Sequence, residues 1–341
     1  MAVKKLRVLA LMHIGLVPPA DATSREENTE WKTEFDVLST LRSIGHEVMP
    51  LGIYDDLGVI RKAIDEWQPH VAFNLLEDFD GVPVFDQNVV SYLELLRIPY
   101  TGCNPRGLML ARDKALSKKI LSYHRIPVPD FVEFPRRKKF RRPTKLRFPL
   151  IVKSQVEEGS VGISQASYVE TEPQLRERVE LIHERTKGDA IAEEFIEGRE
   201  LYATVLGFAK LEVLPLRELV FNQTEPGQPR MATYKVKWDA KYRERWDIAY
   251  QAARPLPKEV SERITHLCKR VYRVLNLSGY ARIDLRLTDK DEIYVLEANP
   301  NPGIAHDEDS TLSALKAGMS YEDFIQRLLT LGLHSSGLQE E

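Results

Sequence analysis

Residues 279–303 read GYARIDLRLTDKDEIYVLEANPNPG, and this segment says more about the structure than any other part of the chain. Two runs of alternating apolar and polar residues flank a polar turn at 288–292, which is the pattern of a β-hairpin. We predict that Leu287 pairs with Tyr294 beside that turn. This pair sets the register of the hairpin, because neighbouring residues of an antiparallel pair continue in step.

In this register, four polar side chains share one face of the hairpin, since alternate residues of a strand point to the same side. Asp284 is opposite Glu297, and Arg282 is opposite Asn299. The other face carries residues that suit a core: Ile283, Leu285, Leu296 and Ala298. Two carboxylates and an amide oxygen suit Mg2+, and the arginine can neutralise developing charge. The alternative is a solvent-facing hairpin with an ordinary Arg–Asp pair.

The composition is that of an ordinary globular protein. Its 341 residues are more than one compact core usually needs, so we expect two or three packed units. Hydrophobic residues at 43% and charged residues at 29% exclude a collagen-like or largely disordered chain. A net charge of −3, from 48 Lys and Arg against 51 Asp and Glu, favours neither a nucleic-acid partner nor a membrane surface.

The two cysteines and the N-terminus favour a cytoplasmic protein. Cys103 and Cys268 lack metal-ligand spacing, which favours reduced thiols over a disulfide framework or a zinc site. The basic start and the apolar run to Val17 resemble a signal peptide, but Arg7 and His13 interrupt the run, so we expect a buried first strand. No stretch has the roughly 18 apolar residues that a membrane helix needs.

Over the first 105 residues, apolar runs alternate with helical patterns, which predicts a parallel sheet with flanking helices. We expect strands at 6–12, 46–49 and 70–75, and helices at 29–44 and 57–67. The central part predicts a helix at 113–124, a hairpin of strands 148–153 and 162–169, a helix at 172–186 and a strand at 190–195.

Strands dominate the pattern from about residue 197 onward. We expect strands at 200–207 and 211–220, a helix at 257–275, the hairpin at 280–299 and a last helix. In that last helix Ser320 and Asp323 form a capping box and Gly332 is the stop signal. Its inward face carries Phe324, Ile325, Leu328 and Leu329.

A basic run interrupts the central part, where eight of the twelve residues 136–147 are Lys or Arg. Three interpretations stay open: a solvated loop, a docking site for an anionic substrate or carrier, and a nucleic-acid contact. Few aromatic residues lie among the charges, which disfavours the nucleic-acid contact.

A glycine-bearing loop, EEGSVG at 157–162, joins the two strands of the central hairpin. The Walker, Gly-x-Gly-x-x-Gly and kinase catalytic-loop signatures are missing from the sequence. The backbone N–H groups around Gly159 and Ser160 can instead close over phosphates, with Lys153 one strand away as a point charge. The alternative is an ordinary hairpin turn.

Several motifs together resemble the ATP-grasp enzymes, most closely the D-alanine:D-alanine ligase branch. They occur in the order seen in that family: RDKALSK with Lys114, FPLIVK ending at Lys153, the Gly159 loop, AEEFIEGRE at 192–200, ARID at 281–284 and LEAN at 296–299. The resemblance covers nearly the whole chain. It implies an α/β and α+β protein with the three-domain ATP-grasp fold: an N-terminal parallel-sheet domain at 1–105, a central lid domain at 106–192 and a metal and substrate domain at 193–341.

The resemblance also implies roles for individual residues. Lys114 and Lys153, with the loop of Gly159 and Ser160, would contact ATP phosphates. Residues 193–200 would form the nucleotide hinge, with Glu193, Glu194 and Ile196 at the adenine and Glu200 at the ribose. Without the resemblance, Glu193, Glu194 and Glu200 would be interpreted as charged residues on a solvent-exposed strand edge.

The metal and catalytic roles follow in the same way. Asp284, Glu297 and Asn299 would hold two Mg2+ ions, or Mn2+ in their place, and Arg282 would stabilise the acyl-transfer intermediate. A third phosphate lysine is expected at Lys237, with Lys241 as the alternative.

The implied reaction is an ADP-forming ligation of a small-molecule carboxylate to an amine. The carboxylate would attack the γ-phosphate of ATP to give an acyl phosphate, and the amine would then displace phosphate. Closure of the central domain would protect the acyl phosphate from water. Dimers are common among the enzymes that the chain resembles, so a homodimer is an expectation by analogy, whereas the near-neutral charge favours neither a membrane nor a nucleic-acid partner.

Three departures from the family concern the substrate. HIGLVPP at 13–19 stands where the family has Gly-Gly-x-Ser-x-Glu, and NLLE at 74–77 replaces His-Gly. HDEDS at 306–310 replaces the Ser-Leu pair that receives the second substrate's carboxylate. Acids there repel a carboxylate, so we expect Glu308 and Asp309 to receive a cationic acceptor such as a basic amino acid, a polyamine or an amidated peptide. The alternative is an exposed acidic loop with the substrate bound elsewhere.

Two other functions remain as alternatives to a ligase. The basic run at 136–147 would suit a small-molecule kinase whose acceptor is a polyphosphate or an inositol phosphate. A non-catalytic ATP-binding regulatory protein is disfavoured, because every implied metal and phosphate position holds a competent residue.

Overall fold

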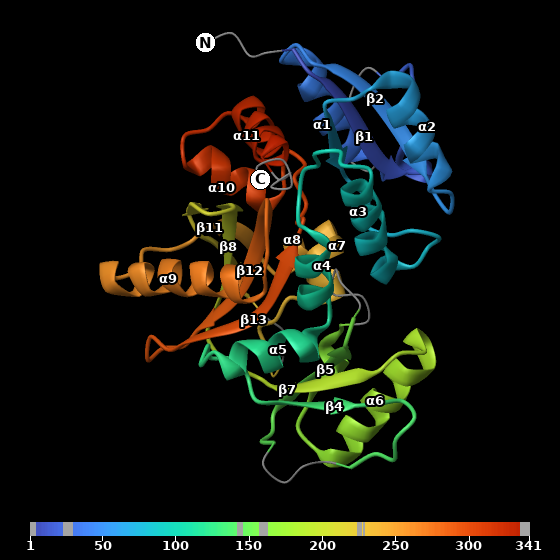
Figure 1. The fold of residues 1–341 in the computed structure, drawn as a ribbon. Coiled ribbons are helices and arrows are strands. Elements are labelled where there is room, and N and C mark those ends of the chain that lie inside the picture. Colours follow the sequence, from blue (N-terminus) through green and yellow to red (C-terminus); the bar gives the residue numbers. More distant parts are fainter. Residues whose placement is uncertain are drawn as a thin grey trace.

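The computed structural model describes residues 5–22, 30–141, 146–156, 163–223, 227 and 229–334, whose strands form three sheets (Figure 1). The first sheet is parallel and has the order β2-β1-β3, with β1 (Arg7–His13), β2 (Glu47–Ile53) and β3 (Val71–Asn74). Strand β1 is buried from Val8 to Met12, as expected for the centre of a parallel sheet. The parallel sheet predicted for the first 105 residues is confirmed.

Helices α1 (Lys32–Ser43), α2 (Gly58–Trp67) and α3 (Asp86–Leu95) belong to this N-terminal unit, with short 3-10 helices at Ile14–Leu16 and Pro83–Phe85. Two helices then lead to the central unit, α4 (Pro105–Arg112) and α5 (Lys114–Tyr123). Helix α4 packs against β13 of the C-terminal sheet and against α3. The sequence patterns did not predict α3 or α4.

The central unit is an antiparallel sheet of order β4-β7-β5-β6. Its elements are β4 (Phe131–Phe134), β5 (Leu150–Ser154), a 3-10 helix at Gln165–Ser167, β6 (Tyr168–Val169), α6 (Glu172–Thr186) and β7 (Ala190–Glu194). A capping box of Thr171 and Gln174 starts α6. Leu175, Val179 and Ile182 of α6 are buried in one apolar cluster with residues of β5 and β7.

The C-terminal unit is a six-stranded antiparallel sheet of order β11-β10-β8-β12-β13, with β9 paired to β8. Its strands are β8 (Arg199–Gly207), β9 (Leu211–Val213), β10 (Arg217–Phe221), β11 (Ile248–Ala252), β12 (Tyr280–Leu287) and β13 (Ile293–Pro300). Its helices are α7 (Tyr234–Trp238), α8 (Ala240–Arg245), α9 (Lys258–Val274), α10 (Asp309–Lys316) and α11 (Tyr321–Leu333).

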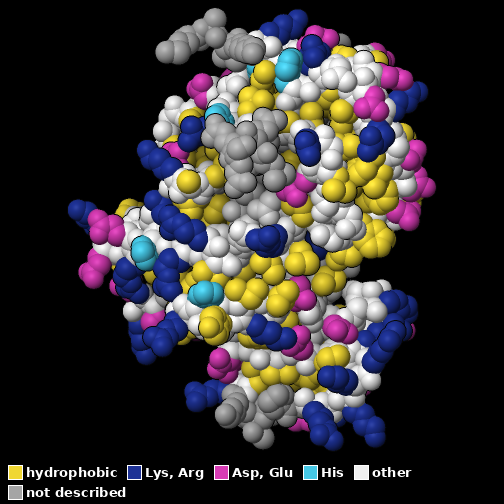
Figure 2. Space-filling model, viewed as in Figure 1, with side chains coloured by type: hydrophobic (Ala, Val, Ile, Leu, Met, Phe, Trp, Pro, Cys, Tyr) yellow, Lys and Arg dark blue, Asp and Glu magenta, His cyan; other side chains and the backbone are white. Residues whose placement is uncertain are grey.

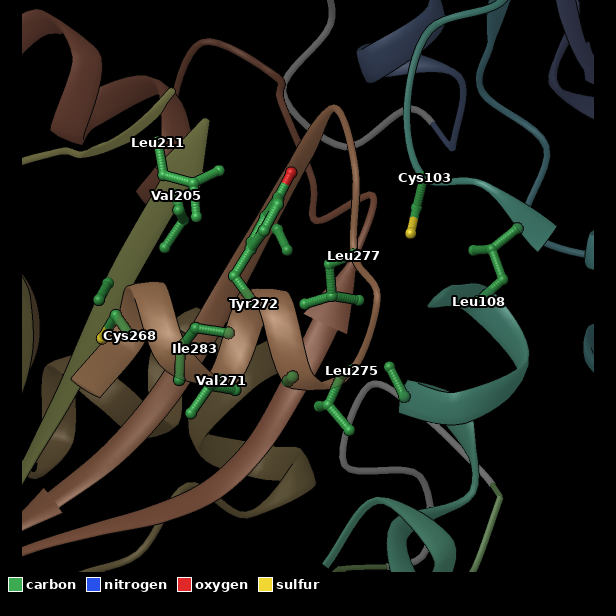
Figure 3. Close-up of a cluster of buried hydrophobic side chains, with 14 of the residues drawn as sticks. Cys103, Leu108, Val205, Leu211, Cys268, Val271, Tyr272, Leu275, Leu277 and Ile283 are labelled. Carbon is green, nitrogen blue, oxygen red and sulfur yellow. The ribbon is translucent and has the colours of Figure 1, made fainter. Parts of the chain in front are cut away.

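Helix α9 packs one face of this sheet to make the largest core cluster (Figure 3). Cys268, Val271 and Tyr272 point from α9 toward Val205 of β8 and Ile283 of β12. Cys103 and Leu108 reach the same cluster from α4 and the residues before it, and both cysteine thiols are free. This core therefore holds the β12–β13 hairpin rigidly against β8.

Three sequence predictions need correction. The strand expected at 162–169 is only Tyr168–Val169, because the described residues before it form a 3-10 turn closed by a Ser164–Ser167 capping box; residue 162 lies outside the described residues. The strand expected at 211–220 is two strands, β9 and β10, which pair with successive parts of β8.

Gly332 does not stop the last helix, although the capping box at Ser320 and Asp323 and the buried face of α11 are as predicted. Helix α11 runs through Gly332 to Leu333. A Cβ at Gly332 would come within 3.0 Å of the Tyr100 carbonyl oxygen and the Thr101 backbone nitrogen. The glycine is needed for close packing between α11 and this segment, not for a change of backbone direction.

Among the helices of the described residues, none is both long and apolar enough to cross a membrane. The described part of the basic run lies on the central unit, and Lys and Arg side chains gather on the same unit in Figure 2. Phe140 alone among residues 136–141 packs inward, where it stacks on Phe134 beneath the guanidinium of Arg176. Residues 142–145 of the run lie outside the described residues.

Candidate active site

The β12–β13 hairpin brings together the four polar residues that the alternation predicts. Asp284 pairs with Glu297, and Arg282 pairs with Asn299. The Arg282 guanidinium donates from Nε and Nη2 to the two oxygens of Asp284, at 2.7 and 2.9 Å. A bidentate, buried contact of this kind fixes both side chains in place.

The pairing at the turn differs from the prediction. Leu287 pairs with Ile293 rather than with Tyr294. A β-bulge in β13 then restores the predicted register. Val295 pairs with Leu285 and Glu297 pairs with Asp284, so residue 296 is left without a partner on β12. Two errors thus cancel: the predicted register is wrong at the turn and correct at the polar residues.

The bulge places Leu296 on the polar face of the hairpin instead of in the core. Val295 is fully buried, whereas Leu296 is partly exposed and lines a cleft beside Glu297. The core face of the hairpin therefore consists of Ile283, Leu285, Val295 and Ala298, with Val295 in place of the predicted Leu296. Because a bulge turns two successive residues to the same side, strict alternation assigned Leu296 to the wrong face.

The cleft lies between β5 and β7 of the central unit and the β12–β13 hairpin, and the surface is indented where the central unit meets the rest of the molecule (Figure 2). It contains eight of the predicted site residues: Lys153, Glu193, Glu194, Ile196, Glu200, Lys237, Asp284 and Glu297. Its other lining residues are mainly apolar: Pro129, Ile151, Ile163, Phe195, Met231, Ala232, Leu296 and Arg286. An apolar cleft with a few converging charges is typical of a ligand site.

The cations of the cleft converge on Glu297. Lys153 Nζ lies 3.1 Å from Glu193 Oε1 and 3.9 Å from Glu297 Oε2. Burial alone would raise the pKa of Glu297, but Lys114, Lys153, Lys237 and Arg282 outweigh it and hold that pKa well below its usual range. Burial and the Glu297 carboxylate raise the pKa of Asp284, against the influence of Arg282. The site is therefore rich in positive charge around one fixed carboxylate.

Glu200, another lining residue of the cleft, is held by two neighbours. Its Oε1 accepts a hydrogen bond from the Tyr202 hydroxyl at 2.8 Å, and its Oε2 accepts one from Arg286 Nη2 at 2.7 Å. Sequence reasoning missed Arg286, since an arginine on an alternating strand reads as a solvated residue. Glu194 also has a partner, because its Oε1 accepts from the Arg147 backbone N–H.

The remaining predicted residues are not all in the cleft. Lys114 is buried at the start of α5, close enough for its charge to act on Glu297. Lys241 is exposed on α8 and is not a lining residue, in contrast to Lys237 on α7. Gly159 and Ser160 lie outside the described residues.

Two of the three acids at 307–309 already have cationic partners. Lys32 Nζ lies 3.2 Å from Asp307 Oδ2, and Arg217 Nε lies 3.1 Å from Asp309 Oδ1. Glu308 pairs with none of the residues that the structure describes and packs on Gly303. Burial raises the pKa of Glu308, against the influence of Lys32 and Arg282. The negative charge available to a substrate is therefore mainly that of Glu308.

The donor set on the hairpin fits a hard cation. It comprises two carboxylates and the amide of Asn299, whose buried Nδ2 has no hydrogen-bond partner among the described residues, so that none of them ties the amide to another group. Among the described residues, no group of three His, Cys, Asp or Glu side chains is arranged to hold a metal. Phosphate oxygens and water would have to complete the coordination, as is usual for Mg2+.

Comparisons with known proteins agree with this geometry. Residues 120–330 match the family model described as the D-ala D-ala ligase C-terminus. The D-alanine–D-alanine ligase of Desulforudis audaxviator is 32% identical over 311 residues, which cover 90% of this chain and 95% of that protein. An uncharacterized protein, y4sG, of Sinorhizobium fredii is 31% identical over 86% of this chain and 85% of its own length.

A solved structure shows the same fold. The D-alanine–D-alanine ligase of Bacillus anthracis, in a crystal structure with ATP, aligns with a TM-score of 0.76 over 98% of this chain and 100% of that chain, at 24% identity. Together with the family match and the relatives, this places the chain in the D-alanine–D-alanine ligase family of ADP-forming ATP-grasp ligases.

Proposed function

We propose that the protein uses ATP and Mg2+ to activate a small-molecule carboxylate and joins it to a cationic amine, releasing ADP and phosphate. One observation supports this most directly: a single cleft presents Lys153 and Lys237 beside the Asp284–Glu297 pair. Cations beside paired carboxylates are what phosphoryl transfer from Mg2+-bound ATP requires.

In the first step, a carboxylate oxygen of the substrate attacks the γ-phosphorus and the bond to ADP breaks. Lys114, Lys153 and Lys237 balance the phosphate charge, and Asp284, Glu297 and Asn299 would hold the Mg2+. Mg2+ held by these residues would supply positive charge that offsets the charge of the phosphate groups. The apolar lining keeps bulk water from the acyl phosphate.

In the second step, a neutral amine nitrogen of the acceptor attacks the acyl carbon, the C–O bond to phosphate breaks, and the proton that the nitrogen loses passes to the departing phosphate or to water. Arg282 is the residue that would act on the tetrahedral intermediate of this step. Its guanidinium is fixed by Asp284 and lies 5.1 Å from the centre of the Tyr202 ring. A positive group fixed in this way is suited to the oxyanion of the tetrahedral intermediate.

Glu308 supports a cationic acceptor. Among the described residues, Glu308 forms no ion pair with a cationic side chain, whereas Asp307 and Asp309 do, and a substrate carboxylate there would meet like charge.

Glu308→Gln should raise the KM for a cationic acceptor at least about tenfold, roughly 1.4 kcal/mol, because it removes the opposing charge and keeps the shape of the side chain. Steady-state kinetics with the acceptor varied measures the effect. Asp307→Asn is the matched control, since Asp307 already pairs with Lys32, and its KM should change less than about threefold. An unchanged KM in Glu308→Gln would refute the cationic acceptor.

The reaction class is tested by a screen for ADP release over pairs of L- and D-amino acids, diamines and small peptides, with mass detection of products. An amide in equal amount to free phosphate supports the ligase. A phosphorylated acceptor without free phosphate would point to a kinase. Tight ATP binding with no ADP release for any pair would point to a regulatory protein.

A further inference from the structure

A lysine outside the predicted set is buried behind the cleft. Lys118 of α5 is only 1% exposed, and its Nζ donates to the Leu296 carbonyl oxygen and lies 3.4 Å from Glu193 Oε2. Its two partners belong to facing parts of the molecule, since Glu193 is on β7 of the central unit and Leu296 is on β13. A buried ammonium is costly unless both its charge and its N–H groups are satisfied, so this placement is specific.

The contact with Leu296 compensates for the β-bulge. Residue 296 has no ladder partner on β12, and its carbonyl therefore needs another donor. Lys118 supplies that donor, while the backbone N–H of Val295 donates to the Pro127 carbonyl at 2.9 Å. The two contacts hold the bulge that turns Leu296 and Glu297 into the cleft.

The contact with Glu193 fixes a second charge. Glu193 lies between Lys118 and Lys153, at 3.4 and 3.1 Å. Without Lys118, the Glu193 carboxylate would have Lys153 as its remaining ion-pair partner and would draw it from Glu297, which is already 3.9 Å away. Burial lowers the pKa of Lys118 to about 8, and the Glu193 carboxylate limits the fall.

We infer that Lys118 is a positioning residue for the nucleotide: it holds the bulge at Leu296 and shares the Glu193 carboxylate with Lys153, so that the Lys153 ammonium stays near Glu297 and available to a phosphate. This rests on the proposed function, since it assumes that the nucleotide binds in the cleft. Lys114 and Lys118 lie one turn apart on helix α5. The charge of Lys114 acts on Glu297, and Lys118 forms an ion pair with Glu193.

Calorimetric titration of the full-length protein with Mg2+ and a non-hydrolysable ATP analogue tests this role. We expect Lys118→Met to fold and to raise the Kd at least tenfold. Lys119→Met is the matched control: its side chain is 55% exposed and pairs with Glu133, so its Kd should stay within twofold of wild type. Thermal melts show which variants are folded.

A double-mutant cycle separates positioning from a loss of stability. If Lys118 acts through Glu193, the effect of Lys118→Met on Kd should shrink at least threefold in a Glu193→Gln background. If Lys118→Met does not fold, Lys118→Gln takes its place, because its amide can still donate but carries no charge. A folded Lys118 variant with a Kd within twofold of wild type overturns the inference, as do fully additive effects. Wild-type protein that does not bind the analogue overturns the proposed function itself.

Discussion

Asp284→Asn will lower the rate of ADP release at least about 1000-fold, roughly 4 kcal/mol of transition-state stabilisation. The substitution keeps the size of the side chain but removes a negative charge from the proposed metal site. It also leaves the Arg282 guanidinium without the carboxylate that holds it at 2.7 and 2.9 Å. A coupled assay for ADP at saturating Mg2+ and ATP measures the rate with the best substrate pair from the screen.

Asp289→Asn is the control for this experiment, because Asp289 is exposed at the turn of the same hairpin. Its rate should stay within about twofold of wild type. Both variants should melt as cooperatively as the wild type. A folded Asp284→Asn protein that keeps a tenth or more of the wild-type rate would contradict the proposed role of Asp284 at the metal.

Lys237→Met will lower kcat/KM for ATP at least about 100-fold, roughly 2.7 kcal/mol, because it removes a cation from the proposed phosphate end of the cleft. Helix α7 carries Lys237 to this position, and Thr233 caps its N-terminus by accepting a hydrogen bond from the Val236 N–H. Steady-state kinetics with ATP varied measures the loss.

Lys241→Met is the matched comparison. Asp239 ends α7 and caps α8, so that Lys241 is on a different helix and exposed. We expect its kcat/KM to change less than about threefold. If Lys241→Met shows the large loss and Lys237→Met the small one, the assignment of the third phosphate lysine is reversed.

The parts of the fold that depend on neighbouring residues were predictable. Alternation in residues 280–299 predicted a hairpin with Asp284 opposite Glu297, and Ser320 with Asp323 predicted the start of α11. The sequence patterns did not predict short helices such as α7, α8 and α10, because one or two turns of helix do not repeat an apolar pattern often enough to be recognised.

The bulge at Leu296 shows the limit of pattern reasoning within a well-predicted element. Alternation assumes that each residue takes the next place in the ladder, and no local signal marks the residue that does not. The bulge is stabilised by Lys118, which precedes it by 178 residues. In the sequence, Lys118 is the last residue of the RDKALSK motif, and no local signal shows that its ammonium is buried.

The charges near the proposed substrate site also separate what the sequence predicts from what only the folded structure shows. The sequence identified three consecutive acids at 307–309 and the order of motifs that places the chain in its family. The tertiary structure alone shows that Lys32, 275 residues away, pairs with Asp307, and that Arg217, 92 residues away, pairs with Asp309. Local sequence determines propensity and alternation because these act over a few residues. Burial and ion pairing depend on which distant segments meet, so only the folded chain shows that Glu308 forms no ion pair with a described residue and that the ammonium of Lys118 is buried.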